Sequence, residues 1–475
     1  MFAALVIGLV SANVRFAGSP VSLVQGAPPQ IDEKQLADAM VDEIGAKKLV
    51  FRPSYTVSQL RAMVPKEARL KQPLPRASTG GWSKIELACK MLNDEHMRLP
   101  YPGTNPLDPE WAEVRRGATP ALDALKRALA APPGQIASTY APMSDFKAYM
   151  RSSGDSFRAY TTLREFAKIL QHRSLFRIAT RDEASSVEDL LVNKKLASRM
   201  SEADANLIRQ LVAIAINAIS NSTIRQVCRD NNLTLPASTR IIDAMEESSP
   251  SEGMANTFVV ELNDFFVPNL QILTDRKELQ KQLPGHPDPF DPKDTIRIMW
   301  QITKAAISNL NRPWSGQIDL DKEVVKATGN ATGHEYVLFD EKSAKKSARQ
   351  LARKLHNIKN PIGKDYCTIA SGSNSGAIGA WFKKRADDQG TLLIVALAAY
   401  RNVHGTLPDT LDNVVSEGLL KVLPKDPYSD GNFHYDKSRE LLWSVGINGK
   451  NDGGKGSKGR PDEPDMVWSL KPLKA

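Results

Sequence analysis

The densest group of residues that could do chemistry lies in the segment LPGHPDPFDPKDT, which begins at Leu283. It places His286, Asp288 and Asp291 close together, so one nitrogen and two oxygens could bind a metal ion. The segment has no second histidine at a helical offset, and its four prolines favour a rigid loop. We therefore interpret these residues as a loop and not as a metal site.

Two other segments come close to catalytic motifs but lack the residue that would react. SGSNSGAIG approaches the nucleophile elbow of hydrolases, but its central residue is Asn374, which cannot act as the nucleophile. GKNDGGKG spaces two glycines and Lys455 as a phosphate-binding loop does, but Gly456 stands where a hydroxyl would ligate magnesium. A segment with two prolines follows in place of the required helix. We therefore expect neither a hydrolase nucleophile in the first segment nor nucleotide binding by the second.

Composition and charge limit the class of protein. A chain of 475 residues is long enough for two or three domains, and a mean hydropathy of -0.35 excludes a polytopic membrane protein. The densest basic run, residues 341–358, has the apolar spacing of a packed amphipathic helix and no nucleic-acid-binding motif. The three cysteines, Cys89, Cys228 and Cys367, lie too far apart in the sequence to form a metal knuckle or a disulfide framework. We interpret them as buried apolar side chains. We expect no nucleic-acid partner.

The N-terminal residues predict export. Residues 2–10 form an apolar run too short to cross a bilayer, and small residues such as Ala12 and Ala17 follow it. We interpret residues 1–30 as a signal peptide, or the remnant of a membrane anchor, with a linker; a buried first helix is the alternative. The protein would then belong to the cell envelope, exported or membrane-anchored on the periplasmic face, with membrane contact through this segment only.

Residues 31–370 are predicted to form an α-helical body, as one domain or two subdomains. Its clearest helix is expected to begin at Ser201, where SEAD offers a capping hydroxyl, and to serve as a core element. Glycine and serine at the start of residues 371–389 predict a linker to the last domain.

Residues 390–475 carry clearer local signals. An apolar helix from Leu392 should end at Gly405, which can adopt a left-handed conformation, and Pro408 prevents its resumption. A short apolar helix should follow near Val414, and strands are expected at FHY, ELLWSVG and DMVWSL. The predicted fold class is α+β: a mostly α-helical body with a C-terminal helix plus a three-stranded antiparallel sheet.

This C-terminal block resembles the globular domain of the major pseudopilins of type II secretion systems, the protein G family. The matching segments, ALAAYRNVHGTLP, LPKDPYSDGNFHY and SVGINGKNDGG with DMVW, supply Tyr400, Gly405, Pro408, Leu423, Pro424, Asp426, Pro427, Tyr435, Ser444, Gly446, Gly449, Asp465 and Trp468. The resemblance implies a pseudopilin-like α+β domain over residues 390–475. The layout of the whole chain also resembles uncharacterised envelope proteins of planctomycete-type bacteria.

In pseudopilins the long loop between strands binds calcium through acidic side chains and backbone carbonyls. The resemblance therefore implies a calcium site formed by Asn448, Asp452, Asp462 and Asp465. Asn448 is an amide where an aspartate is expected, and nearby lysines such as Lys450 work against a divalent cation. An ordinary glycine-rich loop is the alternative.

Two functions from different classes remain. We favour a non-enzymatic structural or protein-interaction component of the envelope, linked to type II secretion or pilus-like systems, whose tail binds a protein partner or a second copy. The chain lacks the glutamate that follows the processing site of pseudopilins, so the usual route into a fibre is not expected. The alternative is an extracytoplasmic hydrolase with a carboxylate or metal site in the helical body.

Overall fold

The computed structural model describes residues 55–69, 81–95, 99–100, 105, 107–130, 146–202, 205–230, 233–247, 251–274, 290–329, 359–429, 431–456 and 465–472. The predictions on the export segment, on the basic helix at 341–358, on His286 and Asp288, and on Asp462 lie outside these residues.

The chain is mostly helical and carries a three-stranded antiparallel sheet, which confirms the predicted α+β class. It divides into two compact units that do not follow the chain order. Unit 1 comprises Met1–Gln72, Phe258–Asn309 and Ile318–Gly376, and unit 2 comprises Pro73–Thr257, Leu310–Gln317 and Ala377–Ala475. The helical body predicted over 31–370, as one domain or two subdomains, is therefore divided between both units.

Unit 1 is a set of helices around an apolar core. Its described elements are α3 (Val57–Ala62), the short helix η1 (Lys66–Ala68), the π-helical turn η3 (Glu261–Phe266), α11 (Val267–Thr274), α13 (Pro292–Leu310), α14 (Leu320–Thr328) and α16 (Pro361–Ser371). Only Val267 separates the π-helical turn from Pro268, whose ring cannot pack beside the carbonyl four residues earlier in a regular helix. Phe266, Ile298 and Cys367 are among its buried side chains.

Asp291, the described member of the three metal candidates in the proline-rich segment, caps a helix. Its carboxylate accepts the backbone N–H of Asp294 at 3.0 Å, at the start of α13. Its own N–H donates to Oδ1 of Asn360 at 2.9 Å, and Asn360 is buried. These contacts give Asp291 a structural role.

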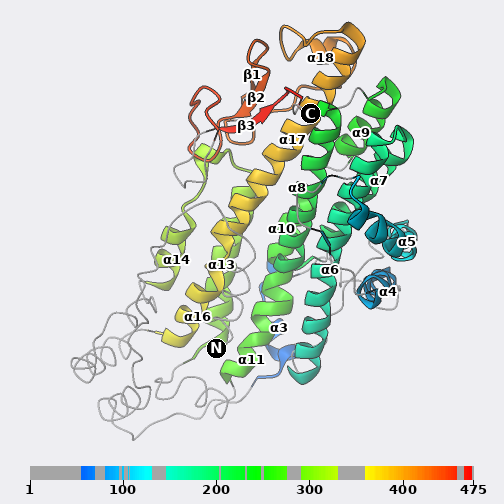
Figure 1. Ribbon diagram of the computed structural model, residues 1–475. Coiled ribbons are helices and arrows are strands. Elements are labelled where there is room, and N and C mark those ends of the chain that lie inside the picture. The colour runs from blue at the N-terminus through cyan, green and yellow to red at the C-terminus, as the bar shows by residue number, and fades with distance from the viewer. Residues whose placement is uncertain are drawn as a thin grey trace, which may run out of the picture. The chain divides into compact units, whose positions relative to one another are not determined.

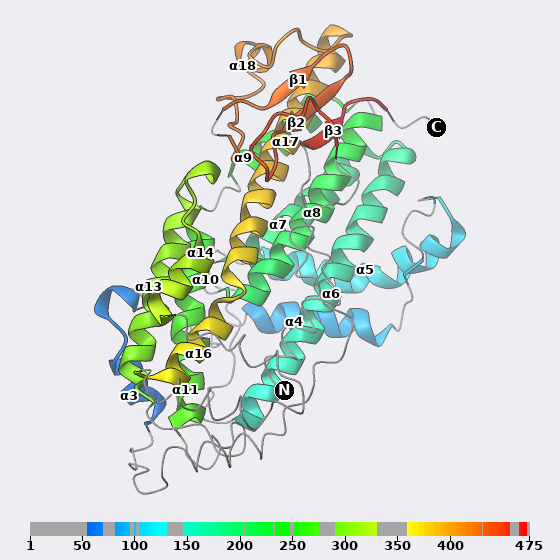
Figure 2. The ribbon, with the colours of Figure 1, turned by 90° about the vertical axis from the view of Figure 1, so that its left-hand side faces the viewer.

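Unit 2 contains α4 (Gly81–Asp94), α5 (Pro109–Leu129), α6 (Phe146–Ala179), α7 (Glu183–Met200), α8 (Leu207–Asp230), α9 (Leu235–Glu247), most of α10 (Ser251–Val260), the short helix η4 (Trp314–Gly316), α17 (Asn374–His404) and α18 (Asn413–Ser416). Its long helices α6, α7 and α8 run side by side (Figures 1 and 2). One apolar cluster joins α4 to α8, and a second joins α7, α8, α9, α17 and the sheet.

Two predicted boundaries were wrong. Residues 371–389 are not a linker, because α16 continues to Ser371 and α17 begins at Asn374. The buried side chains of Trp381 and Phe382 hold this stretch helical despite its glycines. The helix expected from Ser201 begins at Leu207, since Ser201 ends α7.

The sheet lies on the C-terminal half of α17. Its strands are β1 (His434–Asp436), β2 (Leu441–Ser444) and β3 (Met466–Ser469), in the order β1-β2-β3. Tyr435 pairs with Leu442 and Leu442 with Trp468, and this row belongs to the core that α17 shares. As predicted, α17 ends before Gly405, which has a φ of 75°.

Gly390 lets the sheet approach α17. A Cβ added there would lie 2.7 Å from the nearest ring carbon of Trp468, closer than packed carbon atoms come. We expect Gly390→Ala to cost about 1–3 kcal/mol of unfolding free energy through overpacking, although alanine favours helix. Gly379→Ala, where a Cβ would meet open space on the same helix, should be neutral or stabilising. Chemical denaturation of both variants checks this, and equal behaviour would contradict the contact.

Candidate functional site: the loop between β2 and β3

The end of β2, where the loop to β3 begins, is held by a buried aspartate that precedes β1 in the chain. Asp426 is fully buried, and its Oδ1 accepts the Ser444 hydroxyl at 2.8 Å and the Tyr428 N–H at 3.0 Å. Its Oδ2 accepts the N–H of Val445 at 3.0 Å. The KDPY turn is thereby fixed to the end of β2. Because both elements are held by one carboxylate, the loop starts from a rigid position.

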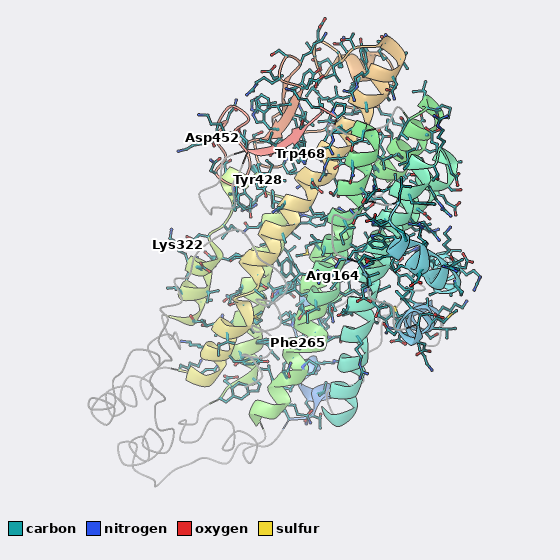
Figure 3. All side chains as sticks on the ribbon, in the orientation of Figure 1. Arg164, Phe265, Lys322, Tyr428, Asp452 and Trp468 are labelled. Carbon is teal, nitrogen blue, oxygen red and sulfur yellow. The ribbon has the colours of Figure 1, made fainter. Side chains whose placement is uncertain are left out.

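A second buried aspartate holds the far side of the loop. Asp465, which is 1% exposed, accepts the N–H of Asp452 at 3.1 Å and the N–H of Gly454 at 2.7 Å. Gly453 and Gly454 both have φ above 70°, which side chains other than glycine rarely adopt. The glycines let the backbone turn its amides toward the Asp465 carboxylate. Figure 3 labels Asp452 near the three-stranded sheet.

The calcium prediction can be compared with these contacts. Asn448 donates from Nδ2 to Asp452 Oδ2 at 2.8 Å, and its Oδ1 accepts the Lys450 N–H at 2.8 Å. Asn448, Asp452 and Asp465 are thus brought together, but their oxygens face N–H groups. In the described residues no cluster of three or more histidine, cysteine or acidic side chains could hold a metal. These three side chains are held by hydrogen bonds within the loop, and Asp462 lies outside the described residues, so calcium binding stays a prediction.

The loop covers Trp443 on the outer side of the sheet. Trp443 Nε1 donates to Asn451 Oδ1 at 3.0 Å, and a Cβ on Gly454 would lie 3.3 Å from the indole. The Arg439 guanidinium lies 5.0 Å from the ring centroid and donates to the Gly453 carbonyl at 2.8 Å. His434 stacks on the same ring. The loop is therefore a packed part of unit 2.

Trp314, on η4, also holds the loop, and no sequence pattern predicts this contact. Its Nε1 donates to the carbonyl of Ile447 at 2.7 Å. Its ring packs against Phe382 and Tyr428, with centroids 5.0 Å and 5.1 Å away. A tryptophan after a proline between two helices has no periodicity that would reveal such a partner. Unit 2 is therefore completed by a segment from the middle of the chain.

A buried polar layer positions α17 beneath the sheet. Lys194, on α7, donates from Nζ to Asn217 and Asn221 on α8, both at 2.8 Å, and to Asp388 on α17 at 2.9 Å. Asp388 also accepts the ammonium of Lys384 at 2.7 Å. Lys194, Asn217 and Asn221 are all buried. Three helices are thereby held in one register.

The same layer extends along α8 and explains why that helix belongs to the core. Asn221 donates to Asp387 at 2.8 Å, and Arg225 donates to the other oxygen of Asp387 at 2.8 Å. Among the described residues, α8 alone is long and apolar enough to cross a membrane by length and composition, and 56% of its most apolar window is buried. The helix was predicted as an apolar core element, but its buried side includes these amides.

Burial and charge shift the pKa of both central groups. Burial lowers the pKa of Lys194, and the Asp388 carboxylate only partly offsets this effect. Burial alone would raise the pKa of Asp388, but the ammonium groups of Lys194 and Lys384 outweigh it and hold that pKa far below its usual range. Lys194 and Asp388 therefore form an ion pair, and the side-chain amides of Asn217 and Asn221 also accept hydrogen bonds from the Lys194 ammonium. We interpret this arrangement as structural and not catalytic.

A surface hollow lies on the helical side of unit 2. It has a volume of about 490 Å³ and is lined by Glu95, Leu99, Pro100, Glu110, Glu113, Val114 and Gly117. The glutamates come from the end of α4 and the start of α5. Because the hollow opens to solvent, water reaches its glutamate side chains. The hollow therefore lacks the water-excluded environment that strengthens catalytic interactions.

Comparison of the chain with protein-family models, with curated proteins and with solved structures finds no match.

Proposed function

We propose that the chain is a non-enzymatic structural or protein-interaction component of the bacterial cell envelope, linked to type II secretion or to a pilus-like system. In this proposal the C-terminal part of unit 2 binds another protein or a second copy of the chain. The binding element is α17 with the sheet β1-β2-β3 and the loop between β2 and β3.

The observation that carries the proposal is the rigidity of this small sheet. Two buried aspartates, Asp426 and Asp465, together accept five hydrogen bonds from the turn, the β2 end and the loop. A surface that is ordered before binding loses less conformational entropy when a partner docks. Such order in a segment rich in glycine supports a recognition role.

Exposed apolar side chains occur at the end of α17 and after α18. Val403, near the end of α17, is 56% exposed, and Val422, which follows α18, is 73% exposed. Aliphatic groups of this kind form the buried centre of protein interfaces. They support contact with a protein rather than with a small molecule.

Charge substitution at this surface tests the proposal. We expect Val403→Asp to abolish a complex larger than the monomer when the detergent-extracted chain is sedimented from its host envelope fraction. Leu87→Asp, on α4, is the matched control because Leu87 is also 56% exposed. A complex that survives Val403→Asp, or that both variants lose equally, would refute the assignment to α17. Recovery of the chain from the cytosol alone would refute the envelope location.

The hydrolase remains a second candidate because the hollow beside α4 and α5 brings Glu95, Glu110 and Glu113 to one opening. Its volume is within the range of small-molecule sites. A general acid and a general base can both be carboxyl groups. Glu110→Gln with Glu113→Gln should abolish any hydrolysis that the purified chain shows toward glycoside, ester or peptide substrates. Unchanged turnover in this double variant would exclude the hollow as the active site.

A further inference from the structure

The loop between β2 and β3 holds the one Asn-Gly dipeptide in the chain, Asn448–Gly449. Both residues are exposed to solvent, and Gly449 has a φ of 66°. Because glycine has no Cβ, its backbone nitrogen can approach the preceding side chain with little steric hindrance. The dipeptide therefore combines an accessible amide with an unhindered nucleophile.

One hydrogen bond of Asn448 favours attack on its side chain. The N–H of Lys450 donates to Asn448 Oδ1 at 2.8 Å, so it stabilises negative charge that develops on this oxygen. Nδ2, the leaving group, donates to the Asp452 carboxylate at 2.8 Å. The Gly449 N–H donates to the Gly446 carbonyl at 3.1 Å within an exposed turn, and this bond must open first.

The geometry points to Asn448 as a site of spontaneous deamidation that loosens the loop. The Gly449 nitrogen attacks Cγ of Asn448, a nitrogen–carbon bond forms, and the bond from Cγ to Nδ2 breaks as ammonia leaves with the proton of Gly449. Water then opens the cyclic imide, which leaves aspartate or isoaspartate at position 448. The overall exchange consumes one water and releases one ammonia, and no other reactant is needed.

The product removes a contact and adds a charge. The Asn448 amide now donates to Asp452, whereas a carboxylate at position 448 has no donor and places a second negative charge beside the first. Isoaspartate also lengthens the backbone between Ile447 and Gly449. The turn that begins at Gly446 would lose its register, while the two amides held by Asp465 lie further along the loop.

Peptide mapping of the full chain tests the modification. After incubation in mildly alkaline buffer, we expect mass spectrometry to find acid at position 448 at least tenfold sooner than at Asn402, Asn413 or Asn432. These controls lie in the same unit but precede Val403, Val414 and Phe433. Conversion at position 448 that is no faster than at the controls would overturn the proposal. Asn448→Gln should remove the signal, because the longer side chain cannot form the five-membered imide.

Native-state trypsin cleavage tests the consequence. Lys450 and Lys455 lie in the loop, so the rate of cutting there reports how often the loop opens. Asn448→Asp mimics the product, and we expect it to be cut about three to ten times faster than the unmodified chain. Asn448→Gln keeps an amide and should be cut at nearly the original rate. Equal rates for the aspartate and glutamine variants would show that the charge does not loosen the loop.

Discussion

Replacement of Asp388 by alanine is expected to lower the free energy of unfolding by about 3–5 kcal/mol, because it leaves a buried ammonium without its counter-charge. Lys194 is 5% exposed and would keep only the oxygens of Asn217 and Asn221. Denaturant unfolding, followed by circular dichroism, measures the loss. A change below about 1 kcal/mol, the size of a surface ion pair, would contradict the described burial.

A double variant separates charge from packing. Lys194→Met with Asp388→Leu removes both charges and should recover most of the stability that Asp388→Ala loses. Asp409→Ala breaks the exposed pair with Lys437 and should have no measurable effect. If the double variant were as unstable as Asp388→Ala, the loss would come from the amides and not from the buried charge.

Acid should reduce the difference between Asp388→Ala and the original chain. The folded-state pKa of Asp388 lies far below its ordinary value of 3.8. Its carboxylate therefore contributes stability that is present above about pH 4 and is lost as the pH falls toward the folded-state pKa. Unfolding measured at falling pH should show the original chain approaching the variant. A constant difference down to pH 2 is the contrary result.

Asp426→Ala has the second-largest expected effect, about 3–5 kcal/mol. It removes the acceptor for the N–H groups of Tyr428 and Val445 and for the Ser444 hydroxyl, all of them buried. Each buried donor that loses its acceptor costs about 1–3 kcal/mol, less what water can replace. Denaturation gives the total, and tryptic cutting at Lys450 shows whether the loop opens first.

Asp426→Asn is the matched control, because it keeps the side-chain shape and one acceptor oxygen. It should lose less stability than alanine but more than a surface substitution, since the amide nitrogen cannot accept the Val445 N–H. If asparagine and alanine were equally harmless, the turn and β2 would not depend on this carboxylate.

The C-terminal elements could be predicted from sequence because their signals are local. Gly405 and Pro408 end α17 through backbone geometry that neighbouring residues cannot change. The three strands follow from short apolar runs separated by turn residues, and they appear at β1, β2 and β3. Local chemistry therefore predicted the α+β class.

Long-range contacts explain what the sequence did not predict. The start of α17 has linker composition, and only the burial of Trp381 and Phe382 shows why it is helical. The pairing of Lys194 with Asp388 joins residues almost two hundred positions apart, so no spacing rule could identify it. The same holds for Trp314 and its carbonyl partner, Ile447.

The sequence indicated which residues of the loop meet, whereas their role as a binding site stays a prediction. Asn448, Asp452 and Asp465 lie together, as the resemblance implies. Their hydrogen bonds to backbone amides could not be predicted, because these bonds depend on the positive φ of Gly453 and Gly454. Residue types indicate possible ligands, whereas the backbone decides which groups those ligands face.

Photo-cross-linking in the native host tests the central claim, that the C-terminal part of unit 2 binds a protein. A photoreactive residue at Val403 should give a discrete adduct with one protein or with a second copy. The same residue at Leu87, which has equal exposure, should give none. A discrete adduct at position 403 alone is the predicted result. No adduct at position 403, or the same adducts at both positions, would contradict a binding role for this surface.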